Sequence, residues 1–178
     1  PPFTLIGATT RISLLSSPLR SRFSGGTYRL QYYTEDEIAT IVENSAHVLG
    51  ITIPHDAALE IAKRSRFTPR IANYYLKRAR DYAQVHKALI DKEVVDTSLS
   101  LLEIDEFGIG ISERMVLESL VNVFHGGPVG ISTLAAATGE EEATIADVTE
   151  PYLLQIGMIE RTPRGRKATE KALQHFKK

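Results

Sequence analysis

The chain of 178 residues has the composition of a folded, soluble protein and a net charge of only −1 at pH 7. Hydrophobic residues make up 43% and charged residues 24%, which excludes the apolar-poor, charge-rich composition of a disordered chain. The absence of cysteine excludes a disulfide framework, a thiolate metal site and a cysteine nucleophile. No apolar run approaches the roughly 20 residues of a membrane helix and nothing resembles a signal peptide. We therefore expect a soluble, cytoplasmic protein without membrane contact.

The first 33 residues contain two expected strands separated by polar segments. Residues 2–7 form a short apolar run that ends in a turn, and residues 27–33 alternate polar and aromatic side chains, as strands do. A polar loop and a basic element, residues 19–23, lie between them. Because a buried strand needs neighbours on both sides, we expect the chain to begin within a domain.

Residues 34–105 carry the signals of a four-helix domain. Thr34 and Glu37 match the capping box of a helix start, and Gly50 is typical of a helix end. Thr68 followed by Pro69 predicts another start, with a side-chain cap and a proline at the first helical position. The expected helices cover residues 34–49, 56–66, 69–86 and 91–103.

A short glycine-bearing linker, residues 105–110, leads to the last expected domain. Helices are expected over residues 112–125, 131–138 and 142–156, followed by a strand over 158–162, a Pro-Arg-Gly turn and a final helix from about residue 167. Three helices followed by a hairpin make a winged helix, in which the hairpin is the wing. The predicted fold class is therefore mainly α.

No residue pattern of a metal site or a hydrolytic site occurs. The five histidines never fall at the i, i+3 or i, i+4 spacing of a helical metal site. No serine occupies the strand-turn-helix setting of an activated nucleophile. We expect the carboxylates to lie at helix starts and on exposed faces, where capping and solubility explain them.

Hydroxyls and cations in loops are the remaining candidates in the first segment. Thr9 and Thr10 follow the first expected strand, and strand ends of open α/β sheets place polar groups against ligands; a capped turn explains them as well. Arg20 and Arg22 flank a serine beside Phe23. The planar guanidinium suits phosphate, although surface arginines are common and the pair is a weak signal alone.

Arg70 occupies the second position of the helix that Pro69 opens. A helix N-terminus carries partial positive charge, so a cation gains nothing from the dipole there. An anion nearby would explain the arginine, and a salt bridge to a carboxylate would explain it equally.

Cations gather at the end of the chain, where residues 161–178 hold seven against one anion. Arg161, Arg164, Arg166 and Lys167 surround the expected wing turn, a shape that reaches phosphates or the minor groove; a solubilising basic tail is the plainer alternative. The expected recognition helix, residues 144–152, has no Arg or Lys. We therefore expect contact with the DNA backbone and little sequence preference.

Taken in this order, these segments resemble the RuvB family of bacterial branch-migration ATPases, which belong to the AAA+ class. The resemblance spans the whole chain, and several blocks in one order argue against chance. The matching blocks are residues 3–11, 15–23, 68–73, 126–130, 150–155 and 161–166.

The resemblance implies the end of an AAA+ α/β core (residues 1–33), a helical lid (34–105) and a DNA-binding winged helix (109–178). It implies a translocase that drives branch migration at Holliday junctions in recombination and repair. Such a motor uses ATP and Mg²⁺, binds double-stranded DNA, and works as a homohexameric ring with a RuvA-type junction-binding partner.

The resemblance also assigns roles to single residues. Thr9 and Thr10 lie in the sensor 1 segment, and Arg22 matches the arginine finger that reaches the neighbouring subunit's nucleotide. Arg70 matches the sensor 2 arginine of the lid, and Pro69 and Tyr33 are further nucleotide contacts. Phosphoryl transfer needs charge stabilisation more than covalent help, which these cations would supply.

Two departures from the family pattern concern the lid and the segment before it. Phe67 stands where the family usually has glycine, which puts the lid's approach to the nucleotide in doubt. Residues 24–27 are less apolar than usual, which puts the register of the following strand in doubt.

The phosphate-binding loop Gly-x-x-x-x-Gly-Lys-Ser/Thr and an apolar strand ending in paired carboxylates do not occur in this sequence. We expect this polypeptide alone neither to bind ATP tightly nor to hydrolyse it. Two other classes stay open: a winged-helix transcription regulator with a helical dimerisation or sensing domain, and a loader-type AAA+ protein whose last domain serves only oligomerisation.

Overall fold

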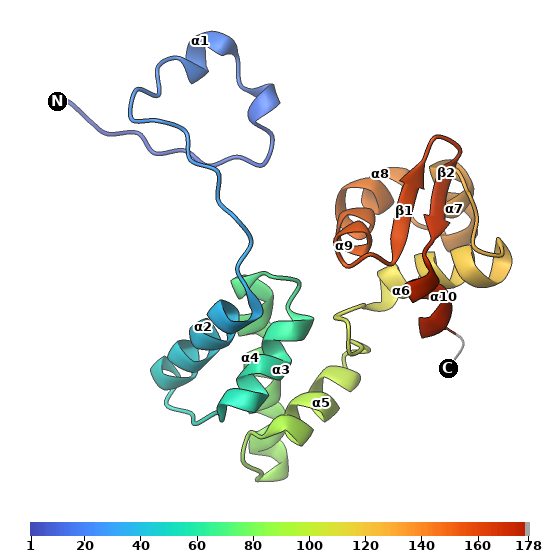
Figure 1. Cartoon of the computed structure of the whole chain (residues 1–178). Helices are drawn as coiled ribbons and strands as arrows, with labels where there is room; N and C mark the ends of the chain where they lie inside the picture. The colour runs from blue at the N-terminus through green and yellow to red at the C-terminus, as the bar shows by residue number, and fades with distance from the viewer. Residues whose placement is uncertain (177–178) are drawn as a thin grey trace. The chain divides into compact units, whose positions relative to one another are not determined.

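The computed structural model describes residues 1–176 of the chain, which form two compact units (Figure 1). Residues 1–31 make up the first unit, and the second contains the remaining described residues. Lys177 and Lys178, the last two cations of the basic end, lie outside the described residues.

The first unit contains only two short helical turns, η1 (Ile12–Leu14) and α1 (Ser17–Arg20). The strands predicted over residues 2–7 and 27–33 are wrong, because neither segment pairs with a neighbour in the described part of the chain. An extended segment becomes a strand only where another backbone completes its hydrogen bonds. Within the unit only Leu15 and Phe23 are even half-buried.

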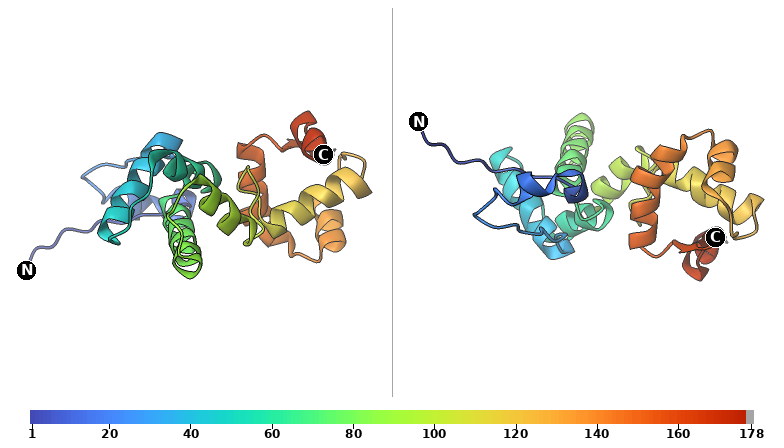
Figure 2. Two further views of the ribbon diagram at one scale, coloured as in Figure 1. Left: turned by 90° about the horizontal axis from the view of Figure 1, so that it is seen from below. Right: turned by 90° about the horizontal axis from the view of Figure 1, so that it is seen from above.

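Four helices build the first domain of the second unit: α2 (Glu35–Val48), α3 (His55–Arg64), α4 (Pro69–His86) and α5 (Lys92–Ser100). They enclose one apolar core, with α2 packed mainly on α3 and α4, and α4 also on α5 (Figures 1 and 2). The predicted capping box is confirmed: Thr34 N donates to Glu37 at 2.8 Å and Glu37 N donates to the Thr34 hydroxyl at 3.2 Å. Gly50 ends the first helix with φ +67°.

The predicted side-chain cap at Thr68 is wrong. Its hydroxyl donates to the carbonyl oxygen of Arg66 at 2.9 Å instead of accepting from the first turn of α4. The carbonyl is within reach because Arg66 and Phe67 both adopt the left-handed conformation, each with φ +55°. Each such residue costs roughly 1 to 2 kcal/mol when it is not glycine.

Phe67 therefore keeps a backbone shape that suits the glycine usual in the resembled family. Its ring packs against the four-helix core and lies 6.3 Å from the Tyr32 ring, centroid to centroid. The packing of the ring compensates for the strained backbone, so the turn between α3 and α4 is retained.

The last domain contains α6 (Ile111–Glu118), η2 (Ser119–Val123), α7 (Ile131–Thr138), α8 (Glu142–Thr144), η3 (Ile145–Thr149), α9 (Glu150–Gln155) and α10 (Glu170–His175). A separate apolar core lies between these helices and the hairpin. The helices predicted over residues 112–125 and 142–156 each contain a π-helical turn, η2 and η3. Pro151 follows η3 and lacks an amide hydrogen for the preceding turn, which favours irregular bonding there.

The wing is an antiparallel hairpin of β1 (Ile159–Thr162) and β2 (Gly165–Ala168), in which Arg161 lies opposite Arg166. The final helix predicted from residue 167 begins later, at Glu170. The backbone of Val129 exchanges two hydrogen bonds of 2.8 Å with Arg166. This third strand segment holds β2 in the ladder and so delays the helix.

The linker between the two domains is fixed by its own hydrogen bonds. One carboxylate oxygen of Asp105 accepts from the amides of Phe107 and Ile109, both at 2.9 Å. Gly108 has φ +69°, and a Cβ atom on it would lie 2.4 Å from the carbonyl oxygen of Arg64. The linker therefore lies directly against the end of α3.

We predict that Gly108→Ala lowers the free energy of unfolding by about 3 kcal/mol, because the added methyl meets backbone that must shift. Gly157→Ala is the matched control: Gly157 has φ +70° but open space around it, so only the backbone cost of about 1 kcal/mol is expected. Urea unfolding at neutral pH measures both. Equal losses of unfolding free energy in the two variants would contradict the close approach of Gly108 to the Arg64 carbonyl.

We also predict that Phe67→Gly is more stable than Phe67→Ala by about 1 kcal/mol, because both remove the ring and only glycine suits a positive φ. At Val85, an exposed position in α4, the order should reverse, since alanine is the better helix former by about 1 kcal/mol. Thermal melts of the Gly and Ala variants at positions 67 and 85 show which variant is more stable at each position. If alanine is more stable than glycine at position 67 as well, the result would argue against the left-handed turn.

Candidate functional site

The predicted residues of the first unit lie on exposed loop and turn backbone. Thr9 accepts a hydrogen bond from the Arg11 amide at 3.0 Å, so its hydroxyl caps a local turn. Thr10 is exposed beside it, and Arg22 is exposed just after α1. The structure shows no sheet edge beneath these side chains within residues 1–31.

The first turn of α4 contains a cation, Arg70, and no acidic residue. Pro69 and Arg70 are the first two residues of the helix. Among the described residues no hydrogen bond or ion pair holds the exposed Arg70 guanidinium. The salt-bridge explanation of Arg70 is therefore not supported, and an anion at this position stays a prediction. Tyr33, which is 46% exposed, lies just before α2.

The wing turn is shaped by glycine and by one side-chain bond. Gly165 has φ +132°, and a Cβ atom on it would lie 2.2 Å from the carbonyl oxygen of Val129. The Thr162 hydroxyl donates to the Gly165 carbonyl at 2.8 Å, which closes the turn over Pro163 and Arg164. The turn residue Arg164 is exposed and has no ion pair within the described residues.

Two of the wing arginines bind a buried glutamate. Arg161 donates from Nε to Glu150 at 2.8 Å, and Arg166 donates from Nε and Nη2 at 3.1 and 2.9 Å. The side chain of Glu150 is 1% exposed, against 16% for Arg166 and 58% for Arg161. Burial alone would raise the pKa of Glu150, but the hydrogen bonds from both arginines outweigh burial and lower that pKa.

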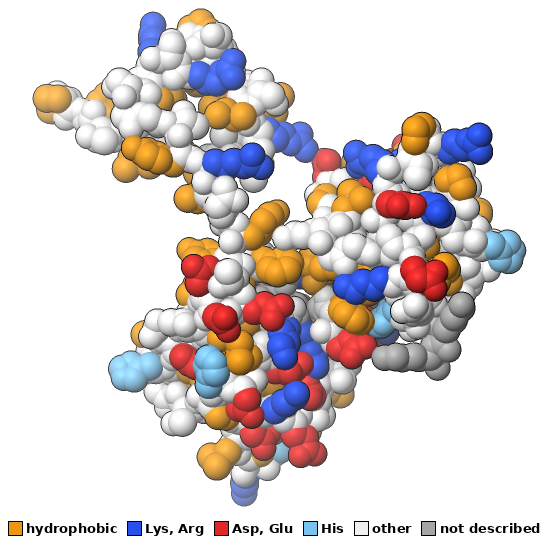
Figure 3. Space-filling view, viewed as in Figure 1, with side chains coloured by type: hydrophobic (Ala, Val, Ile, Leu, Met, Phe, Trp, Pro, Cys, Tyr) orange, Lys and Arg blue, Asp and Glu red, His pale blue; other side chains and the backbone are white. Residues whose placement is uncertain are grey.

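The four predicted DNA-binding cations are therefore not equivalent. Lys167 pairs across the hairpin with Glu160 at 3.4 Å, and both side chains are half exposed. Arg164 at the tip is the cation most available to a phosphate, while Arg166 mainly holds the hairpin to α9. Lys and Arg side chains gather around the hairpin end of the domain in Figure 3, with acidic side chains among them.

Three carboxylates are buried, those of Glu60, Glu113 and Glu150. Glu113 and Glu150 lie in the first turns of α6 and α9, as expected, and Glu113 accepts from the Gly110 amide at 3.2 Å. The expectation is wrong at Glu60, which is buried in the interior of α3. Each of the three has an arginine within 2.8 Å. A buried charge is tolerated only when it is paired and hydrogen-bonded, and the fold supplies that partner each time.

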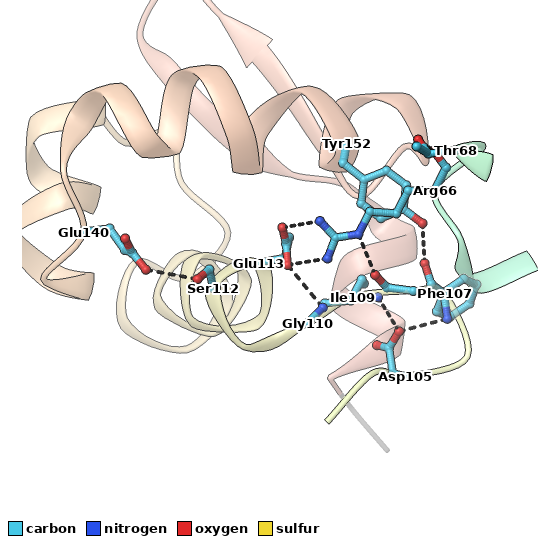
Figure 4. Close-up of polar contacts among 11 residues, drawn as sticks. Arg66, Thr68, Asp105, Phe107, Ile109, Gly110, Ser112, Glu113, Glu140 and Tyr152 are labelled. Carbon is cyan, nitrogen blue, oxygen red and sulfur yellow. Dashed lines mark hydrogen bonds and ion pairs between the residues drawn. The ribbon is translucent and has the colours of Figure 1, made fainter. Parts of the chain in front are cut away.

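Sequence analysis did not identify Arg66, which joins the two domains of the second unit (Figure 4). Its Nη1 and Nη2 atoms donate to the two carboxylate oxygens of Glu113, each at 2.8 Å, and Nε donates to the Gly108 carbonyl at 3.1 Å. The guanidinium lies 4.9 Å from the centroid of the Tyr152 ring. The one sequence feature that pointed to this turn was the neighbouring Phe67, which stands where the resembled family usually has glycine.

Tyr152 completes the contact between α9 and the linker. Its hydroxyl donates to the Phe107 carbonyl, and burial raises the pKa of Tyr152 to about 12. The phenol thus stays protonated and keeps donating across the neutral pH range.

Three of the five histidines each have a partner of their own. His175 lies 3.0 Å from Asp105, His55 lies 2.7 Å from Glu43, and His86 stacks on Tyr82. Among residues 1–176 no group of three or more acidic or histidine side chains could hold a metal ion. None of the helices in that range is long and apolar enough to cross a bilayer.

Comparison with known proteins identifies both domains of the second unit. Residues 33–105 match the RuvB AAA lid domain, and residues 106–177 match the RuvB C-terminal winged helix domain. The structure of the Thermotoga maritima RuvB Holliday junction branch migration motor is similar with a TM-score of 0.87 and 48% identity. Two singly substituted variants of that protein give the same values. Each match covers 99% of this chain and 59% of the relative, so the chain spans little more than half of their length.

We predict that Glu150→Gln destabilises the protein at pH 7 by about 2 kcal/mol. The value lies below the roughly 3 to 5 kcal/mol of a fully buried pair, because the exposed side of Arg161 can be hydrated. Since the folded-state pKa of Glu150 is lowered, its contribution is present above the unfolded-state pKa of about 4.3 and is lost as pH falls through the folded-state pKa. The difference in the free energy of unfolding between the unmodified protein and Glu150→Gln should therefore become smaller below about pH 4.

Glu160→Gln is the control, because Glu160 also pairs with a wing cation but is 53% exposed. An effect under about 0.5 kcal/mol is expected there. Urea unfolding between pH 3 and 7 measures the free energy of unfolding of both variants and of the unmodified protein. A destabilisation by Glu150→Gln that grows on acidification would contradict the role of Glu150.

Proposed function

The chain belongs to the RuvB family, and we propose on this premise that it is the C-terminal part of an ATP-driven motor subunit that moves Holliday junctions. Residues 1–33 would be the end of the AAA+ core, residues 34–105 the lid, and residues 109–178 the DNA-binding domain. The family matches and the similarity to the Thermotoga maritima motor support the proposal.

DNA contact through the wing rests on one observation, the exposed and unpaired Arg164 at the hairpin tip. Guanidinium groups bind phosphate oxygens through paired hydrogen bonds, and a narrow hairpin can reach a groove or the backbone of a duplex. Lys167 and the exposed part of Arg161 would add to the contact. Arg166 would act by holding the wing in shape.

The helix that carries the proposed sensor 2 arginine is suited to a nucleotide phosphate. The start of α4 has unpaired amides and partial positive charge, and the unpaired Arg70 adds a full charge there. Pro69 and Tyr33 would line the same nucleotide, while Thr9, Thr10 and Arg22 would act as sensor 1 residues and as the arginine finger in trans. ATP hydrolysis would also need a phosphate-binding loop and Mg²⁺ ligands, which this sequence does not supply.

Ring assembly and partners follow from the same proposal. A finger contributed in trans requires a neighbouring subunit, which fits a homohexamer, and a RuvA-type protein would bring the ring to a junction. The setting would be recombination and repair in the cytoplasm.

The other two classes receive less support. A sequence-specific regulator needs base-reading cations or amides in its recognition helix. The expected recognition helix, residues 144–152, contains no Arg, Lys, Asn or Gln, and Gln155 follows only at the end of α9. A last domain that served only oligomerisation would give no reason for an unpaired arginine on an exposed hairpin.

We predict that Arg164→Ala weakens binding of two unrelated DNA duplexes equally and lowers the salt dependence by about one unit in the slope of log K against log salt. Removal of a single phosphate contact changes the slope by that amount, because fewer counterions are released. Fluorescence anisotropy of labelled duplexes at several salt concentrations measures both quantities.

Lys77→Ala removes one charge from the exposed surface of α4 and should leave the slope unchanged. Unaltered binding by Arg164→Ala would overturn wing contact, and a strong preference for one duplex would favour the regulator.

A further inference from the structure

Arg66 uses all three nitrogens of its guanidinium at the boundary between the lid and the winged helix. Its partners come from the linker and the winged-helix domain: the carbonyl of Gly108 in the linker, the carboxylate of Glu113 on α6, and the ring of Tyr152 on α9. The Glu113 side chain is 5% exposed and that of Arg66 is 20% exposed. Because the planar guanidinium of Arg66 bonds both oxygens of the Glu113 carboxylate, the pair fixes the relative orientation of the two groups as well as their distance.

On the lid side Arg66 is tied to the start of α4. The Thr68 hydroxyl donates to the Arg66 carbonyl, and two residues later Arg70 occupies the second position of the helix. The left-handed turn at residues 66 and 67 fixes the backbone between them. A movement of the α4 start therefore displaces the backbone that carries the Arg66 guanidinium.

On the winged-helix side the contact reaches the wing through α9. Tyr152 lies two residues after Glu150 in this short helix, and Glu150 binds Arg161 of β1 and Arg166 of β2. Arg164 lies in the turn between those strands. Each link from Arg66 to the hairpin is thus a hydrogen bond, a ring contact or one turn of helix.

We propose that Arg66 is a positioning residue that couples nucleotide contact at the start of α4 to DNA contact at the wing. The inference rests on the proposed function, because it needs phosphate at Arg70 and duplex at Arg164. Through Arg66, a lid movement that follows the nucleotide changes the orientation in which the wing meets DNA.

The test measures a coupling rather than a single affinity. In the complete protein, duplex affinity is measured with and without a slowly hydrolysed ATP analogue, and the ratio of the two dissociation constants is the coupling. For the unmodified protein we expect a ratio of at least about 5, within the usual range for linked sites. Arg66→Gln should bring the ratio to about 1 while the nucleotide-free dissociation constant changes by less than about twofold.

Arg78→Gln is the matched control. Arg78 also has an ion pair, to Asp81 at 2.9 Å, and a ring contact, to Tyr74 at 5.5 Å, but both partners lie on α4 itself. This variant should keep the full ratio. A merely structural contribution of Arg66 would change the two dissociation constants in parallel and leave their ratio intact.

Arg66→Lys covers the case in which Arg66→Gln does not fold. Lysine keeps the charge but cannot bond both oxygens of Glu113 and the Gly108 carbonyl in fixed directions, so the ratio should again fall to about 1. A full ratio in a folded Arg66 variant, or a ratio of 1 in the unmodified protein, overturns the coupling. Absence of duplex binding or of nucleotide binding by the unmodified protein would instead overturn the proposed function.

Discussion

The second unit depends on buried carboxylates that are each paired with arginine. Glu60 binds Arg64 inside the lid, Glu113 binds Arg66 between the domains, and Glu150 binds two arginines of the wing. Leaving such a carboxylate buried without its partner is strongly unfavourable. The pairs of Glu113 and Glu150 therefore each fix the geometry between two elements, whereas Glu60 and Arg64 lie one turn apart on α3.

The same pairs change how the basic end of the chain is interpreted. The count of cations suggests a broad phosphate-binding surface, but Glu150 engages Arg161 and Arg166, and Glu160 engages Lys167. What remains at the tip is Arg164, on a hairpin whose shape the other cations maintain. Under the proposed function, a small, unpaired contact of this kind would suit a protein that holds and releases DNA without reading its bases.

Elements whose signals lie within a few residues were predictable from the sequence. The capping box of Thr34 and Glu37, the Gly50 stop and the order of helices before a hairpin all depend on neighbours in the chain. The blocks that resembled the RuvB family indicated both domains, and the family matches confirmed that recognition. Arg70 was also placed correctly at the second position of its helix, since Pro69 fixes the helix start.

The tertiary structure alone decided which charged groups that are distant in the sequence meet. Arg66 and Glu113 are 47 residues apart, and Arg166 and Glu150 are 16 apart, separations at which no local periodicity predicts a contact. The second wing strand likewise formed because Val129 pairs with Arg166, while residues 2–7 remained unpaired for want of a neighbour. Local patterns specify which segments can form helices or strands, but long-range partners determine which strands form and which charges become buried.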